Sequence, residues 1–176
     1  MHKRKFMLLY RLSARAHATG SSMIEVLVSL IIIAFAMLGA VGLQVTSMKM
    51  SKGASLRTQA ILLSTEIAER METNKVASLS GAYMVPFSST PALATADCLV
   101  SACTSEQLAS YDIAEWSSRV TATLQGASWQ ITQTTAGNPA TYQIVVNWED
   151  RRSKTEYAEG GTAETFAYTA TKVVHE

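Results

Sequence analysis

The sequence predicts an α+β fold, in which a long N-terminal helix packs on an antiparallel β-meander beside a second, short helix. Three observations support this class: an apolar run with helical continuation, a helix-capping signature at Thr104, and alternating segments near the C-terminus. The chain has 176 residues, which leaves room for one modest domain beyond the long helix.

The N-terminal helix begins with a run that contains no ionisable side chain from Val26 to Val45. At about 1.5 Å per residue, a helix of this length spans the roughly 30 Å hydrocarbon core of a bilayer. Glu25 stands at the start of the run and Gly20 five residues earlier. The first 20 residues hold no acidic residue and five basic ones: Lys3, Arg4, Lys5, Arg11 and Arg15.

This order of basic leader, Gly20, small polar residues, Glu25 and apolar helix resembles the class III signal of type IV pilins and of the pseudopilins of type II secretion. The resemblance implies that a prepilin peptidase cleaves after Gly20 on the cytoplasmic side. Ser21 would then be the new N-terminus and the site of N-methylation. Many major pilins have phenylalanine at the position of Ser21, so the chain departs from the family pattern there.

Two other interpretations of the same stretch remain open. A plain membrane anchor accounts for the apolar run and its basic flank, but not for Gly20 or for the position of Glu25. An ordinary secretory signal has an apolar core of roughly 7–15 residues, which is shorter than this run.

Glu25 is the most informative side chain, because an unpaired carboxylate near hydrocarbon costs on the order of 2–3 kcal/mol. We expect it to contact the free amine of Ser21 on a neighbouring subunit, where low dielectric strengthens the attraction. The alternative is an interfacial glutamate that faces lipid headgroups.

Charge is distributed unevenly along the chain. The 15 Lys and Arg residues nearly balance the 14 Asp and Glu residues, but loss of the leader would leave 10 basic residues against 14 acidic ones, a net charge of −4. This acidic balance argues against nucleic-acid binding. The basic leader predicts a cytoplasmic N-terminus and a periplasmic domain, a bias that Lys49, Lys52 and Arg57 weaken without reversing it.

The predicted domains are a cleaved leader (1–20), a transmembrane and assembly helix (21–47) and a periplasmic pilin-like domain (48–176). The helix should continue from about Ser22 to about Asn74, because no proline precedes Pro86 and apolar residues recur at helical spacing. Its expected inner stripe is Val45, Met48, Leu56, Ile61, Leu62, Ile67, Ala68 and Met71. From Lys75 to Ala96 the composition predicts a loop.

Thr104 and Gln107 fit a capping box, so a second helix should begin there and end near Leu124 to Gly126. Its apolar face is expected to be Leu108, Tyr111, Ile113, Trp116, Val120 and Leu124. The segment from Cys98 to Trp116 resembles the minor-pilin subfamily called type IV pilus modification protein PilV. With the N-terminal signal, this resemblance implies a pilin-like roll.

Three alternating segments predict strands: Ser128–Thr134, a strand centred on Tyr142–Trp148, and Thr165–Val173. Strands joined by turns favour an antiparallel meander. Each of Trp116, Trp129 and Trp148 lies on the apolar face of its element, which predicts core positions. The charged run Glu149-Asp150-Arg151-Arg152 is expected to be a solvated turn.

Cys98 and Cys103 are expected to form a disulfide, because the predicted compartment is oxidising and the two residues enclose a short loop. A metal site would need more ligands, and His2, His17 and His175 show no metal-ligand spacing. We expect no cofactor and no enzymatic activity, because no catalytic motif stands out.

The leading hypothesis is a minor pilin of the inner membrane and then of the pilus fibre. Its expected partners are prepilin peptidase, other minor and major pilins, the inner-membrane pilus assembly machinery and membrane lipid, but not nucleic acid. The alternatives are a minor pseudopilin of a type II secretion system and a membrane-tethered sugar-binding or hydrolytic module.

Overall fold

The computed structural model describes residues 22–150 and 164–176 of the chain. The chain divides into two compact units, Met1–Gln44 and Val45–Glu176. The first unit contains the N-terminal part of helix α1 (Met23–Thr73), and the second contains the rest of α1 and all the other elements. The predicted α+β class is confirmed, and α1 agrees closely with the helix expected from Ser22 to Asn74.

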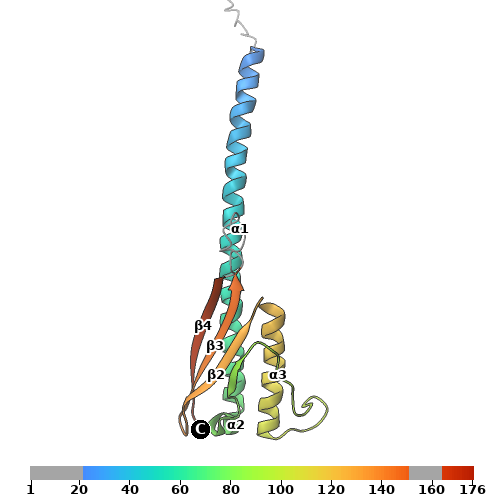
Figure 1. Ribbon diagram of the computed structural model, residues 1–176, viewed down its shortest axis with the longest axis vertical. Helices are drawn as coiled ribbons and strands as arrows, with labels where there is room; N and C mark the ends of the chain where they lie inside the picture. Colours follow the sequence, from blue (N-terminus) through green and yellow to red (C-terminus); the bar gives the residue numbers. More distant parts are fainter. Residues whose placement is uncertain (1–21, 151–163) are drawn as a thin grey trace, which may run out of the picture. The chain divides into compact units, whose positions relative to one another are not determined.

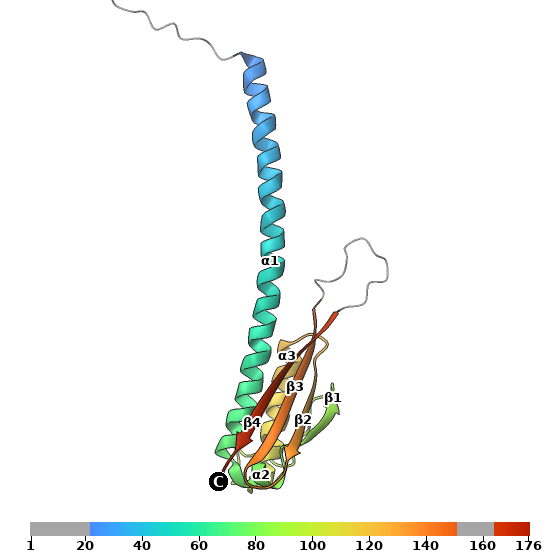
Figure 2. The same ribbon diagram turned by 90° about the vertical axis from the view of Figure 1, so that its left-hand side faces the viewer.

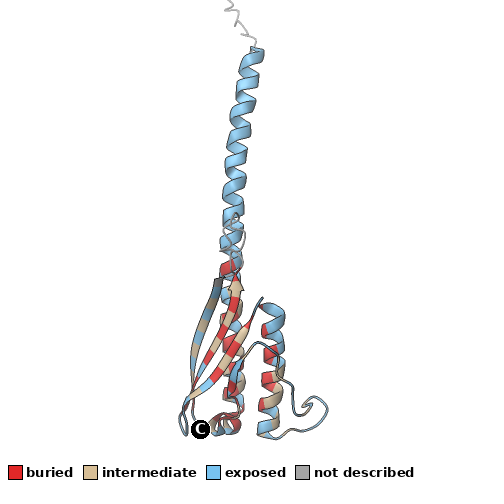
Figure 3. Ribbon diagram, in the orientation of Figure 1, coloured by how far each residue is buried: buried red, intermediate tan, exposed pale blue. Residues whose placement is uncertain are grey.

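The part of α1 in the second unit buries a narrower stripe than the sequence pattern predicts. Ile67 and Met71 are buried as expected, but Val45, Met48 and Leu62 are exposed. The buried stripe is completed by Ala60, Leu63 and Ser64, which precede Ile67 by seven, four and three residues. The prediction was therefore wrong for three of the eight residues of the expected stripe, although the helical period was right (Figure 3).

In the described residues, four strands form one antiparallel sheet in the order β1-β2-β3-β4, which confirms the predicted meander (Figure 2). The strands are β1 (Val85–Ser88), β2 (Ser128–Thr135), β3 (Ala140–Asp150) and β4 (Glu164–Val174). The last three coincide with the predicted strands, each a little longer. Strands β2, β3 and β4 follow one another in the chain, whereas the segment between β1 and β2 contains helix α3 (Ser105–Thr123).

One face of this sheet is buried, and the other is more accessible. Along β3, buried residues alternate with less buried ones, and along β4 the residues from Thr165 to Val173 alternate between exposed and half-buried. Helix α3 (Ser105–Thr123) and the adjacent part of α1 supply the other side of the core (Figure 1). Trp116, Trp129 and Trp148 are all buried, as the sequence predicts.

The predicted loop from Lys75 to Ala96 is wrong in two places. It contains a short helix, α2 (Lys75–Ser80), and the edge strand β1. Helix α2 ends at Gly81, whose φ of 87° lies in the left-handed region that favours glycine. Both elements are held by tertiary contacts: Ser78 donates a hydrogen bond to the carbonyl of Met71, and β1 pairs with β2 through Val85 and Ile131.

Helix α3 starts at the predicted capping box. Gln107 N donates to Thr104 Oγ1 at 3.3 Å, and Thr104 N donates to Gln107 Oε1 at 2.9 Å, so both halves of the motif are present. The expected apolar face is correct for Ile113, Trp116, Val120 and Leu124, but Leu108 is 36% exposed.

The connection from α3 to β2 requires a glycine, because Gly126 has a φ of 60° and an added Cβ would lie 2.6 Å from Glu149 Cγ. In the charged run predicted as a solvated turn, Glu149 and Asp150 instead belong to strand β3. Asp150 is 3% exposed at the end of β3, so that prediction is wrong for Asp150. Arg151 and Arg152 lie outside the described residues.

Candidate functional site

The N-terminal part of α1 carries a continuous apolar surface. Every residue from Ser22 to Gln44 is exposed, and an 18-residue window of the helix reaches a mean hydropathy of 2.8 with no residue buried. Within residues 22–150 and 164–176, α1 is the one helix long and apolar enough to cross a membrane by length and composition. Because burying a Leu or Ile side chain yields about 1.5–3 kcal/mol, this surface favours an apolar environment.

Glu25 lies in the first turn of α1 and its side chain is exposed. The turn is closed by backbone hydrogen bonds from Glu25 N and Val26 N to the carbonyl of Ser22, and Ser29 Oγ donates to the Glu25 carbonyl at 2.8 Å. A carboxylate at a helix N-terminus is favoured by the helix dipole. Gly20 and Ser21, the predicted cleavage and methylation residues, lie outside the described residues.

The second unit contains a charged cluster between α1 and α3, centred on Arg70. Arg70 Nη1 lies 2.7 Å from Asp112 Oδ1, and Arg70 Nη2 lies 2.8 Å from Glu115 Oε2 and 3.0 Å from Glu66 Oε1. Arg119 Nη2 contacts the same glutamates, at 2.7 Å from Glu66 and 3.2 Å from Glu115. This Arg70 cluster joins one α1 turn to two α3 turns.

The electrostatic balance of the cluster keeps Arg70 charged. Burial lowers the pKa of Arg70, but the hydrogen bonds to Asp112 and Glu115 outweigh it, so the pKa lies above its ordinary value. A charge held this way stabilises the helix pair most when its partners are also shielded from water. The Asp112 side chain is only 9% exposed, which makes it the shielded partner.

Tyr83 extends the Arg70 cluster into the segment between α2 and β1. Its hydroxyl donates to Asp112 Oδ2 at 2.6 Å, and Asn74 Nδ2 lies 3.3 Å from that hydroxyl and 2.8 Å from the Ser105 carbonyl. Burial and the hydrogen bond to Asp112 raise the pKa of Tyr83. The bend after α1 is thereby fixed to the start of α3.

The sequence did not predict this cluster, although it held a usable signal. Asp112 falls among Ala109, Ile113 and Trp116 on the buried face of α3, where a charged residue requires a partner. Trp116 Nε1 next to it donates to the Leu63 carbonyl at 2.8 Å, so α3 is fixed to α1 by polar as well as apolar contacts.

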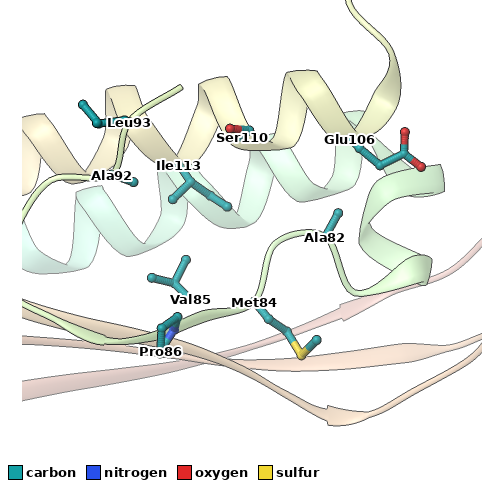
Figure 4. A pocket seen from close by; sticks show the side chains of 9 residues that line it. All are labelled: Ala82, Met84, Val85, Pro86, Ala92, Leu93, Glu106, Ser110 and Ile113. Carbon is teal, nitrogen blue, oxygen red and sulfur yellow. The ribbon is translucent and has the colours of Figure 1, made fainter. Parts of the chain in front are cut away.

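A small cavity of about 390 Å³ opens between β1 and α3 (Figure 4). Its lining is mostly apolar and consists of Ala82, Met84, Val85, Pro86, Ala92, Leu93, Glu106, Ser110 and Ile113. The two polar side chains both come from α3, and Ser110 Oγ already accepts a hydrogen bond from Thr95 N at 3.1 Å.

The disulfide between Cys98 and Cys103 is present, as the sequence predicts. It closes a short loop before α3 that exposes Leu99 and Val100, each 83% accessible. Among the described residues, no group of three or more His, Cys, Asp or Glu side chains is arranged to hold a metal ion. His2 and His17 lie outside the described residues.

Comparison with known proteins gives one family match. Residues 42–114 match the family model described as Tt1218-like, type IV pilin Tt1218. The matched stretch covers fewer than half of the 176 residues and includes the C-terminal part of α1, the disulfide loop and the first turns of α3. No curated protein and no solved structure matches the chain. The family match and the exposed apolar helix support a type IV pilin-like protein and fit a membrane-anchored pilus component.

Proposed function

We propose that the chain is a minor pilin of a type IV pilus, similar to the modification proteins called PilV. It is cleaved by prepilin peptidase after Gly20 and enters the fibre through its apolar N-terminal helix, where it primes assembly or modifies the pilus. The observation that carries this proposal is the combination of the pilin family match with an apolar helix that has no buried residue in its span.

The proposal assigns the chain a structural role with protein and lipid partners. Before assembly, the helix holds the protein in the inner membrane with a cytoplasmic N-terminus and a periplasmic domain, as the five basic leader residues favour. The partners are prepilin peptidase, other pilins and the assembly machinery. Glu25 contacts the Ser21 amine of a neighbouring subunit, and methylation of Ser21 follows cleavage.

Leader processing tests the proposal directly. Gly20→Val should leave the protein at precursor size in cells that contain prepilin peptidase, because the peptidase requires the small residue before the cleaved bond. Gly39→Ala is the matched control, since an added Cβ at Gly39 meets nothing within 4 Å and the leader is unchanged. N-terminal sequencing of the wild type should begin at Ser21, and a mature-sized Gly20→Val protein would refute the proposal.

The alternative is a minor pseudopilin of a type II secretion system, which would share the anchor and the domain. Co-purification from detergent-solubilised membranes separates the two. Recovery of pilus subunits supports a pilus role, whereas recovery of secretion-system pseudopilins favours the alternative.

A further inference from the structure

The cavity between β1 and α3 combines apolar walls with a carboxylate at one end. Val85 of β1 and Ile113 of α3 face each other across it, and Glu106 in the first turn of α3 lies at its end (Figure 4). Its volume of about 390 Å³ is at the low end of the roughly 300–1,000 Å³ that ligand pockets span. The cavity therefore suits one or a few aliphatic side chains rather than a whole helix.

The apolar surface continues beyond the cavity onto its rim. Leu93 is 92% exposed, and the side chains of Met84 and Phe87 are exposed as well. Phe87 follows Pro86 of the lining and belongs to β1, the edge strand of the sheet. Exposed apolar side chains that gather at one place are typical of a surface that binds a partner. A small molecule inside the cavity would leave this rim uncovered, so the surface fits a segment of a protein better.

The stretch of chain that builds the cavity carries only negative charge. The sequence contains no Lys, Arg or His between Lys75 and Arg119, and every lining residue comes from this stretch. Of its four carboxylates, two are neutralised in the Arg70 cluster. The other two belong to Asp97 and Glu106, and neither forms an ion pair within residues 22–150 and 164–176.

Both of these carboxylates are close to the cavity. Glu106 is part of the lining, and Asp97 comes two residues after Thr95, whose N–H donates to Ser110 Oγ of the lining at 3.1 Å. The Asp97 side chain is held in place by the N–H of Leu99, which donates to Asp97 Oδ1 at 3.0 Å. Asp97 and Glu106 are both exposed, so a cation can reach them from solvent. Charge complementarity therefore selects a basic residue beside the aliphatic one.

We propose that the cavity between β1 and α3 binds a segment of a partner protein in which a large aliphatic side chain stands next to a lysine or arginine. The aliphatic side chain lies between Val85 and Ile113 and supplies the affinity, whereas the basic group contacts Glu106 and supplies the selectivity. A second copy docked with two-fold symmetry is disfavoured, because Asp97 and Glu106 of the two copies would face each other. The inference goes beyond the proposed function, since every residue that it uses lies in the second unit.

The test is photo-crosslinking of the full-length, detergent-solubilised protein with a short peptide in which a photoactivatable leucine is followed by lysine. Cross-links located by mass spectrometry should map to the lining, at Met84, Leu93 or Ile113. A peptide with glutamine in place of lysine should label about two- to fivefold less, the effect of an exposed ion pair, and a glutamate peptide should label less still. Salt near 1 M should remove these differences, because the Debye length falls to about 3 Å.

Three variants separate the charge from the cavity. Glu106→Gln should lower labelling by the lysine peptide to the level of the glutamine peptide. Glu69→Gln is the matched control, since it removes an exposed carboxylate that is not part of the lining and should change nothing. Ala92→Leu fills the cavity and should reduce labelling by all three peptides. Its urea midpoint shows whether the larger side chain also unfolds the protein, and the comparison of the two glutamine variants does not depend on it.

Each contrary result overturns the inference in a different way. Equal labelling by the lysine and glutamate peptides would remove the role of Glu106, and cross-links that map outside the lining would remove the cavity. Dimerisation of the full-length protein that abolishes peptide labelling would show that a second copy covers the cavity instead. None of these results bears on leader processing in Gly20→Val, so the inference and the proposed function fail separately.

Discussion

Asp112 occupies a position on α3 where the helix otherwise presents apolar residues to α1. Its carboxylate accepts hydrogen bonds from Arg70 Nη1 at 2.7 Å and from Tyr83 at 2.6 Å. The carboxylate is therefore shared by α1, α3 and the segment that joins α2 to β1. A single side chain in this position couples three parts of the chain that apolar packing alone would leave free to slide.

Asp112→Asn should lower the free energy of unfolding by about 2 kcal/mol, since it weakens two hydrogen bonds that involve charged groups. Urea denaturation of the detergent-solubilised protein, followed by tryptophan fluorescence, measures the effect, because all three tryptophans lie in the core of the second unit. Glu69→Gln removes an exposed carboxylate from α1 and should cost little. Equal losses for the two variants would contradict a specific role for Asp112.

Tyr83 makes the stability of the second unit sensitive to alkaline pH. Its pKa is raised in the folded chain by burial and by Asp112, whereas the unfolded chain releases the proton near pH 10. The stabilisation is complete below about pH 10 and is lost as the pH rises toward the folded pKa, because the unfolded state then binds fewer protons. Burial raises the pKa of Tyr142 in the same direction.

Tyr83→Phe should therefore be less stable than the wild type at neutral pH and should show a shallower decline of unfolding free energy above about pH 10. The slope should not vanish, since Tyr142 is retained. Urea midpoints across this alkaline range provide the measurement. A decline as steep as that of the wild type would show that Tyr83 does not govern the alkaline transition.

At the scale of elements, the sequence predicts the helices and strands that carry a signal within their own residues, such as a capping box or strict alternation. The start of α3 is marked by Thr104 and Gln107, and β3 by strict alternation through Tyr142 and Trp148, so both were recognised. Helix α2 has six residues and its N-cap Asn74 makes no side-chain capping bond. Strand β1 has four residues and contains Pro86, which argues against a strand.

These two elements depend on partners that lie far away in the chain. Tyr142 Oη on β3 donates to the Ser78 carbonyl in α2, and β1 follows the register of β2. The Arg70 cluster escaped prediction for the same reason, because its five members come from two helices whose mutual register no local pattern encodes. Side-chain pairing between elements is the part of the fold that one sequence does not display.

The capping box offers a prediction at this scale. Thr104→Ala should destabilise the second unit by about 1 kcal/mol, because one backbone donor at the start of α3 loses its acceptor. In a double-mutant cycle with Gln107→Ala, the two losses should add to more than the loss of the double variant, since each residue caps the backbone of the other. Strict additivity in thermal unfolding would show that the two bonds act independently.

At the scale of the whole molecule, substitution of Glu25 tests its proposed role in assembly separately from membrane insertion. Glu25→Gln should leave insertion and leader removal unchanged, because the apolar run and Gly20 are intact. Incorporation should fall, since the neighbouring Ser21 amine loses the charge that would neutralise it in the stack. The ratio of this protein in sheared pili to that in membranes is the measurement, with Glu69→Gln as the control. If Glu25→Gln gave the same ratio as the wild type, Glu25 would be an interfacial residue with no role in assembly.

The position of β4 has a consequence for the time at which the second unit can fold. Val174, two residues from the C-terminus, is fully buried, and Lys172 Nζ lies 2.7 Å from Glu72 Oε2 on α1. The core joins the first helix to the last strand, so it cannot close until the whole chain has emerged. Until β4 has been synthesised, the apolar side chains of Ile67 and Met71 on α1 remain exposed. A nascent subunit truncated before β4 therefore leaves its core uncovered and is prone to aggregation and proteolysis, so this unit folds only after β4 has been synthesised.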